Sequence, residues 1–293
     1  MAAGIFRIDK TMRERPAGLI AGITGVAVLS PDSLLLRFAD CEAFAASAVR
    51  GLMIALAALA LFVVFPSLRR GFRWRPMLLY AAVFGIGTVS FALSIKYTYI
   101  ANTLVIIASS PLLAAIGARL FIGEVVAVQT WLAAVVVALG VLVIFLLRPD
   151  SAAESIGIGD LLALGAAASL AGTSIILRKH RTMAAGPGLM MGGFFAALLS
   201  APFADYADIS TSDFAWLTLN GVVVVPVAFL LTAYAARRLP PPETTLLFLL
   251  ETIFGSVLAL LFLGEFPPQT TIGAGVIILG AVLAHSFWAL RRG

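Results

Sequence analysis

The sequence predicts an all-α integral membrane protein with ten transmembrane helices arranged as a 5+5 inverted repeat. Of its 293 residues, 61% are hydrophobic and only 12% are charged, and the mean hydropathy is +1.05. No soluble domain of this length has such a composition. In addition, the second half of the chain echoes the first, because the sequence LFIGE at 120–124 returns as LFLGE at 261–265.

The apolar residues form runs of membrane-spanning length that are joined by short connections. About 20 apolar residues suffice for a helix to cross the hydrocarbon core, and the bilayer offers the backbone no water, so each run should be helical. The predicted helices are 17–38, 43–65, 76–98, 100–121 and 125–147 in the first half, and 158–178, 187–204, 214–236, 243–263 and 269–290 in the second half.

Five of these ten predicted helices hold a charge or a proline away from their ends. In chain order, these residues are Asp32, Arg50, Pro111, Pro226 and Glu251. A charge inside a membrane is costly, and a proline removes a backbone hydrogen bond from a helix. Each of the five residues is therefore a candidate for a role in function or in helix packing.

Basic residues set the predicted orientation. Lys and Arg cluster before the first predicted helix, after the second, sixth and eighth, and at the C-terminus, whereas the loop at 205–213 is acidic. Cytoplasmic loops carry an excess of Lys and Arg. Both termini and the loops 66–75, 178–186 and 237–242 are therefore predicted to face the cytoplasm.

The repeat and the orientation together predict how the halves are related. We expect a first five-helix unit at 1–147 and a second at 148–293. An odd number of helices per unit makes the two units enter the membrane in opposite directions. Inverted repeats of this kind are typical of transporters, in which two similar bundles move about a site between them.

Glu251 is the acidic residue placed deepest in an apolar stretch, and Thr244 and Phe248 share its predicted helix face. Its carboxyl could bind a substrate ammonium, carry a coupling proton, or hold a neighbouring helix end. Hydroxyl and aromatic residues on other helices fit a small amphipathic ligand. The full predicted substrate-binding set is Tyr80, Phe84, Thr88, Ser110, Thr173, Thr244, Phe248 and Glu251.

Asp32 and Arg50 are predicted to lie at similar depth, which makes them a candidate buried ion pair whose role is packing rather than substrate binding. Pro111 and Pro226 are predicted to kink their helices and to act as gating hinges. Glu124 and Glu265 directly precede predicted helices, where a carboxylate would meet the positive end of the helix dipole.

The composition and motifs argue against several other classes. The net charge of +5 reflects basic loops rather than nucleic-acid binding. Gly157-Ile158-Gly159-Asp160 matches one motif of intramembrane aspartyl proteases, but the second aspartate motif is missing from the preceding helix. His180 and His285 are too far apart for a zinc motif, and no nucleotide-binding loop occurs. We therefore expect no enzyme activity, metal or cofactor, although a channel, an intramembrane enzyme and a membrane scaffold stay open as alternatives.

The sequence KYTYIAN at 96–102, the Ser110-Pro111 step, Gly123-Glu124, and Leu250-Glu251 with FLGE at 262–265 occur in an order that resembles the drug/metabolite transporter superfamily. More narrowly, the chain is similar to the ten-helix EamA-type branch. The resemblance implies a bacterial inner-membrane exporter of amino acids, aromatic ones in particular, with a drug or another metabolite as the alternative substrate. It leaves the oligomeric state and the coupling ion open.

Overall fold

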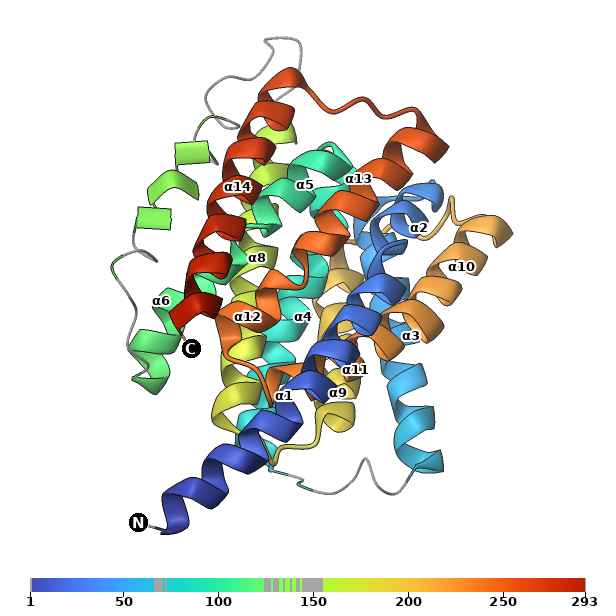
Figure 1. Ribbon diagram of the computed structural model, residues 1–293. Helices are drawn as coiled ribbons and strands as arrows, with labels where there is room; N and C mark the ends of the chain where they lie inside the picture. Colours follow the sequence, from blue (N-terminus) through green and yellow to red (C-terminus); the bar gives the residue numbers. More distant parts are fainter. Residues whose placement is uncertain are drawn as a thin grey trace.

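The computed structural model describes residues 2–65, 71, 73–123 and 155–292, together with scattered positions between 128 and 143. All regular structure in these residues is helical, as Figure 1 shows. Eight helical segments are long and apolar enough to cross a membrane: Arg15–Phe38, Ala43–Val64, Trp74–Tyr97, Ile100–Ile122, Gly157–Lys179, Ala185–Phe203, Thr211–Ala236 and Pro241–Leu263.

These eight segments coincide with eight of the ten predicted spans, which are thereby confirmed as apolar helical segments. The tenth prediction, 269–290, falls on helix α14 (Gln269–Arg292). The described apolar stretch of this helix, Gln269–Ala281, is shorter than the eight membrane-spanning segments. The fifth prediction, 125–147, lies largely outside the described residues, as does Glu124. The count of ten spans is therefore not confirmed.

Four uninterrupted helices form the centre of the molecule: α3 (Ala43–Val64), α4 (Trp74–Tyr97), α8 (Ser155–Lys179) and α9 (Ala185–Ser200). Helix α3 packs against α9, and α4 packs against both α8 and α9. Glycine allows the α3–α9 contact, because a Cβ atom on Gly193 would lie 2.7 Å from the Gly51 oxygen. Each contact joins the first half of the chain to the second.

Three of the predicted spans are divided into two helices each. They are α1 (Ala2–Leu29) with α2 (Asp32–Phe38), α5 (Ile100–Ile107) with α6 (Ser110–Ile122), and α12 (Pro241–Leu246) with α13 (Leu249–Leu263). The division between α5 and α6 falls next to Pro111, where a kink was predicted, whereas the division between α12 and α13 was not predicted. Pro111 therefore lies in the first turn of α6, where its missing N–H removes no helical hydrogen bond, rather than kinking a helix from within.

The span that contains Pro226 is uninterrupted but irregular. It consists of α10 (Thr211–Thr218), a π-helical segment η3 (Leu219–Val224) and α11 (Val225–Ala236). The Val225 amide donates to the Asn220 carbonyl oxygen, five residues back, and Pro226 itself has no amide hydrogen to donate. A π-helical segment therefore lies just before Pro226, and such segments occur frequently at functional sites.

The bundle has two chemically different ends. Arg15, Arg178 and Arg238 lie at the end that we call the basic end, where Arg15 pairs with Glu243 and Arg178 donates to the Arg238 carbonyl oxygen. At the opposite end, which we call the acidic end, helix α2 and the start of α10 lie away from the N-terminus (Figure 1). Helix α1 packs along α11, so a helix of each half again forms the contact.

Candidate functional site

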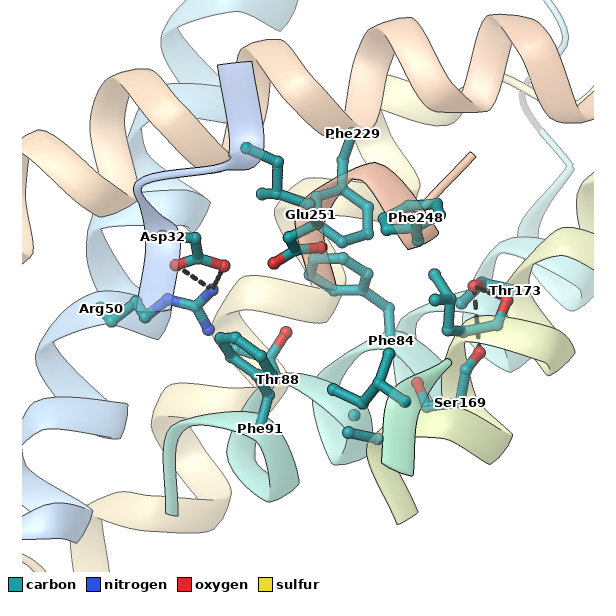
Figure 2. Close-up of a pocket in the computed structure, with 15 residues that line it drawn as sticks. Asp32, Arg50, Phe84, Thr88, Phe91, Ser169, Thr173, Phe229, Phe248 and Glu251 are labelled. Atoms are coloured by element: carbon teal, nitrogen blue, oxygen red, sulfur yellow. Dashed lines mark hydrogen bonds and ion pairs between the residues drawn. The ribbon is translucent and has the colours of Figure 1, made fainter. Parts of the chain in front are cut away.

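A cavity lies in the middle of the bundle, between the two halves of the chain (Figure 2). Its volume is ≈ 60 Å³, enough for roughly four to six waters at about 10–15 Å³ each. Helices α2, α3, α4, α8 and α13 contribute its charged and hydroxyl groups, and aromatic rings form much of the remaining wall. The residues that define it here are Asp32, Arg50, Phe84, Thr88, Phe91, Ser169, Thr173, Phe229, Phe248 and Glu251.

Asp32 and Arg50 form an ion pair on one wall of this cavity. Arg50 Nη2 lies 2.8 Å from Asp32 Oδ2 and 3.0 Å from Oδ1, and both side chains are buried. Pro31 ends the preceding helical turn, so that Asp32 begins α2 at the level of Arg50 on α3. The depth argument from the sequence therefore predicts a pairing that the structure contains.

Asn220 completes this group from the π-helical segment. Its amide nitrogen donates to Asp32 Oδ1 at 2.6 Å and to the Asp32 carbonyl oxygen at 3.1 Å, and its oxygen accepts from Arg50 Nε at 2.8 Å. Two nitrogens of the guanidinium are therefore occupied. The third, Nη1, is buried without a hydrogen-bond partner among the described residues, and the Arg50 Cζ atom lies 5.5 Å from the centre of the Phe91 ring.

Glu251 reaches the same cavity from the first turn of α13. It is 4% exposed, and no described residue forms a hydrogen bond with its carboxyl group. Figure 2 shows the carboxyl pointing toward the space between the Asp32–Arg50 pair and the Phe84 ring. The N-terminal turn of a helix favours a negative charge, but a buried carboxylate still needs a partner. A ligand cation or a proton could provide it.

Four aromatic rings separate the central cavity from a second, smaller one. The ring centres of Tyr80 and Phe84 lie 5.9 Å apart, those of Phe84 and Phe229 lie 4.9 Å apart, and those of Phe229 and Phe248 lie 6.4 Å apart. The second cavity, at ≈ 10 Å³, lies next to this aromatic row and shares Thr173 with the first. The row therefore lies between the central cavity and the side chains nearer the basic end.

The predicted substrate-binding residues fall into three groups. Five of them line the central cavity: Phe84, Thr88, Thr173, Phe248 and Glu251. Tyr80 and Thr244 line the second cavity, where the Thr244 hydroxyl donates to the Pro240 carbonyl oxygen. Ser110 is buried and lines neither cavity, so the structure does not bring it together with the others.

Two important residues were missed in the sequence. Asn220 is fully buried beside Asp32 and Arg50, and Phe229 lies between the two cavities. Both belong to the predicted helix 214–236. An amide side chain inside an apolar run is a recognisable signal for a polar contact, because such groups seek partners within the bundle. Phe229, in contrast, is one aromatic among 20 phenylalanines and carries no distinguishing signal.

The cavity has a pattern that follows the internal repeat. In the repeated sequence, Glu124 of the first copy corresponds to Glu265 of the second. Four pairs of cavity-lining residues have the same separation along the chain as these two glutamates, so each pair occupies corresponding positions of the two copies. The pairs are Leu29 with Leu170, Asp32 with Thr173, Thr88 with Phe229, and Ile107 with Phe248. The cavity is therefore built from matching positions of the two copies.

A second polar group closes the acidic end. Glu265 Oε2 lies 3.3 Å from Arg37 Nη2, and Glu265 Oε1 accepts a hydrogen bond of 2.6 Å from the Ile100 amide. Glu265 therefore caps α5 of the first half and not the helix that follows it in sequence, contrary to the expectation. Arg37 also donates to the Thr98 carbonyl oxygen at 2.8 Å. These contacts join α2, the start of α5 and the end of α13.

Within the described part of the chain, no three His, Cys, Asp or Glu side chains are arranged to hold a metal ion. The polar groups of the cavity instead suit hydrogen bonding and ion pairing with a small organic molecule. Its charged wall and its aromatic wall fit a ligand with one polar and one apolar end.

Comparison with known proteins agrees with the two-copy architecture. Residues 17–146 and 157–286 each match the EamA-like transporter family. A search of curated proteins finds no match. A solved structure titled only "Crystal structure of protein" is 17% identical, covers 94% of this chain and 99% of its own, and superposes with a TM-score of 0.69, which shows a shared fold. The two matched segments cover most of the sequence, and the chain belongs to the EamA-like transporter family of multi-pass membrane proteins.

Proposed function

We propose that this transporter exports small amphipathic solutes of the amino-acid type, aromatic amino acids among them, from the bacterial cytoplasm across the inner membrane. The observation that carries this proposal is the composition of the central cavity. Asp32, Arg50 and Glu251 provide charge on one side, and Phe229 and Phe248 provide apolar surface on the other. An amino acid with an apolar side chain has matching ends.

The size of the cavity supports transport by alternating access. At ≈ 60 Å³ it has room for a few waters but not for an aromatic amino acid. The Arg37–Glu265 ion pair lies at the acidic end, and the aromatic row lies on the side of the basic end. Entry of a solute therefore requires the two halves to move relative to each other, as in other repeat-based transporters.

We infer that the basic end faces the cytoplasm, because Lys and Arg accumulate there and positive charge is retained on the cytoplasmic side. Single-cysteine labelling in a Cys41→Ser background can test this orientation. A cysteine at Arg73 should react only with a reagent that crosses the membrane. Labelling of Arg73→Cys by an impermeant reagent added outside intact cells would reverse the proposed topology.

Glu251 provides the direct test of the proposed substrate class. The purified protein in proteoliposomes should take up labelled phenylalanine by counterflow, which distinguishes a carrier from a channel. We expect Glu251→Gln to weaken uptake about tenfold or more, because a charge-assisted bond to the substrate ammonium is lost. Glu243→Gln is the matched control, since Glu243 lies at the basic end and lines neither the central cavity nor the second one.

Two outcomes would count against this function. Absence of phenylalanine counterflow by the folded wild-type protein would exclude aromatic amino acids as substrates. Full counterflow by a well-folded Glu251→Gln variant would show that the carboxyl does not bind the ammonium. A screen of organic amines in the same vesicles would then examine the alternative, a drug or another metabolite.

A further inference from the structure

We propose that Arg50 is the carboxylate-binding residue of the cavity, with Asp32 and Asn220 as positioning residues that hold its guanidinium. This inference rests on the proposed function and assigns the second charged group of the solute. It also changes the interpretation of the Asp32–Arg50 pair, which the sequence suggested to be a packing element alone. The site would recognise zwitterions that carry an apolar side chain.

The unpartnered nitrogen of Arg50 is the main evidence. Asp32 accepts hydrogen bonds from Nη2, and Asn220 accepts one from Nε. The third nitrogen, Nη1, has no acceptor among the described residues and is shielded from solvent. Leaving a buried donor unpaired is unfavourable, and the penalty is larger for a charged group. Because Arg50 lines the cavity, a solute that enters it can supply the missing acceptor.

The two neighbours fix the direction in which Nη1 points. Asp32 accepts two contacts from one edge of the guanidinium, and Asn220 bridges Asp32 and Arg50. A planar guanidinium that is held at two nitrogens cannot rotate, so the third nitrogen keeps a single orientation. In Figure 2 this nitrogen lies on the side of the guanidinium away from Asp32, toward Phe91 and Thr88.

Glu251 explains why the acceptor should be a carboxylate on a zwitterion. An α-amino acid carries its ammonium and its carboxylate on one carbon, and both Glu251 and Arg50 face the same small cavity. The ammonium would pair with Glu251, and the carboxylate would accept from Arg50 Nη1. An amine without a carboxylate would satisfy Glu251 but would leave Arg50 Nη1 unpartnered.

The apolar part of the solute would then face the opposite wall. Phe229 and Phe248 of the second half form this wall together with Leu170. A side chain that extends from the charged groups meets these residues first. This placement predicts a preference for apolar side chains, because Phe229, Phe248 and Leu170 offer no hydrogen-bonding partner and the neighbouring Ser169 and Thr173 hydroxyls already donate to backbone carbonyl oxygens.

Binding of two ligands by the purified, full-length protein tests the assignment. Phenylalanine and phenethylamine share the ring and the ammonium and differ in the carboxylate. We expect the wild type to bind phenylalanine about 10- to 100-fold more tightly than phenethylamine, as one charge-assisted hydrogen bond provides. In the double variant Asp32→Asn/Arg50→Gln, which removes both charges of the pair, this preference should disappear while phenethylamine still binds.

Two further variants keep the test sharp. Arg50→Lys retains a cation opposite Asp32 but lacks a second terminal nitrogen, so it should also lose the preference if the double variant does not fold. Arg37→Gln is the control, because Arg37 lies at the acidic end and does not line the central cavity; it should keep the preference.

Equal binding of the two ligands by the wild type, or an undiminished preference in folded Arg50→Lys, would overturn the assignment. The proposed function would survive either result, provided that phenylalanine is still transported. Failure of the wild type to bind or transport phenylalanine would instead overturn both. Glu251→Gln further separates the role of Glu251 from that of Arg50, since it should weaken the binding of phenylalanine and phenethylamine alike.

Discussion

The buried ion pair allows a prediction whose size follows from burial. We expect Asp32→Asn to lower the free energy of unfolding by about 3–5 kcal/mol, the usual cost of removing one partner from a buried pair. The substitution keeps the shape of the side chain and an oxygen that can accept from Arg50. What it removes is the negative charge next to a guanidinium that is only 2% exposed.

The loss of a hydrogen bond alone would lower the free energy of unfolding by less. Polar contacts between membrane helices contribute about 0.6 kcal/mol on average and about 1.7 kcal/mol at most. The exposed pair Arg15–Glu243 has a comparable N–O distance of 3.1 Å, but its side chains are 48% and 30% exposed. Glu243→Gln should therefore cost only about 0–1 kcal/mol, because water screens such pairs.

Unfolding of the purified protein in detergent, followed by heating or by denaturant, measures both variants. At about 2–4 °C per kcal/mol, Asp32→Asn should lower the melting temperature by about 6–20 °C, and Glu243→Gln by no more than about 4 °C. The double variant Asp32→Asn/Arg50→Gln should recover much of the loss, since no unpaired charge remains. Equal shifts for the two single variants would refute the argument from burial.

The other predictions concern packing, hinge motion and closure. Gly193→Ala should destabilise the protein by about 1–3 kcal/mol in the same melt, because its Cβ would lie 2.7 Å from a backbone oxygen, whereas Gly273→Ala, with nothing within 4 Å, should not. Pro226→Ala supplies the missing amide and should slow phenylalanine counterflow while leaving its binding affinity within about threefold; unchanged turnover would contradict a hinge. Glu265→Gln should increase labelling of cysteines introduced at the acidic end, and unaltered labelling would show that the Glu265 ion pair does not close it.

The spans were predictable because their signal is local. An apolar run of sufficient length leaves the backbone no alternative to a helix in the bilayer. Proline marks two of the three breaks within spans, at Pro31 and next to Pro111, but the third break was not predictable because it depends on contacts between distant segments. The break before Leu249 has neither proline nor glycine, and the Thr252 hydroxyl next to it donates to the Leu104 carbonyl oxygen at 3.1 Å. Only the folded bundle supplies that contact.

The site residues were also predictable only in part. Helical spacing correctly placed Phe248 and Glu251 near one cavity, but it gives the face of a helix and not the depth at which a cavity opens. Thr244 lies on α12, on the other side of the break from Glu251 on α13, and lines the second cavity instead. Ser110 was proposed as a hydroxyl residue that fits the ligand, yet it is buried and lines neither cavity.

The repeat explains why a symmetric architecture can form an asymmetric site. Matching positions from both copies meet at the cavity, so equal residues on both sides would make two equivalent walls. Instead, Asp32 corresponds to Thr173 and Thr88 corresponds to Phe229. The first copy thus contributes an ionic side chain and a hydroxyl where the second contributes a hydroxyl and an aromatic ring.

This divergence between the copies also bears on how a solute would be held as the halves move. Arg50 and Asp32 belong to the first copy and pair with each other, whereas Glu251 and Asn220 belong to the second, so the Asn220 hydrogen bonds are the contacts of this group that join the two copies. A zwitterion bound to Arg50 and Glu251 would add a further bridge between them. An amine bound to Glu251 alone would not, and we therefore expect it to be carried more slowly than phenylalanine in the same vesicles, even where its binding is saturated. Equal maximal rates for phenylalanine and phenethylamine would show that the bridge between the copies plays no part in the movement.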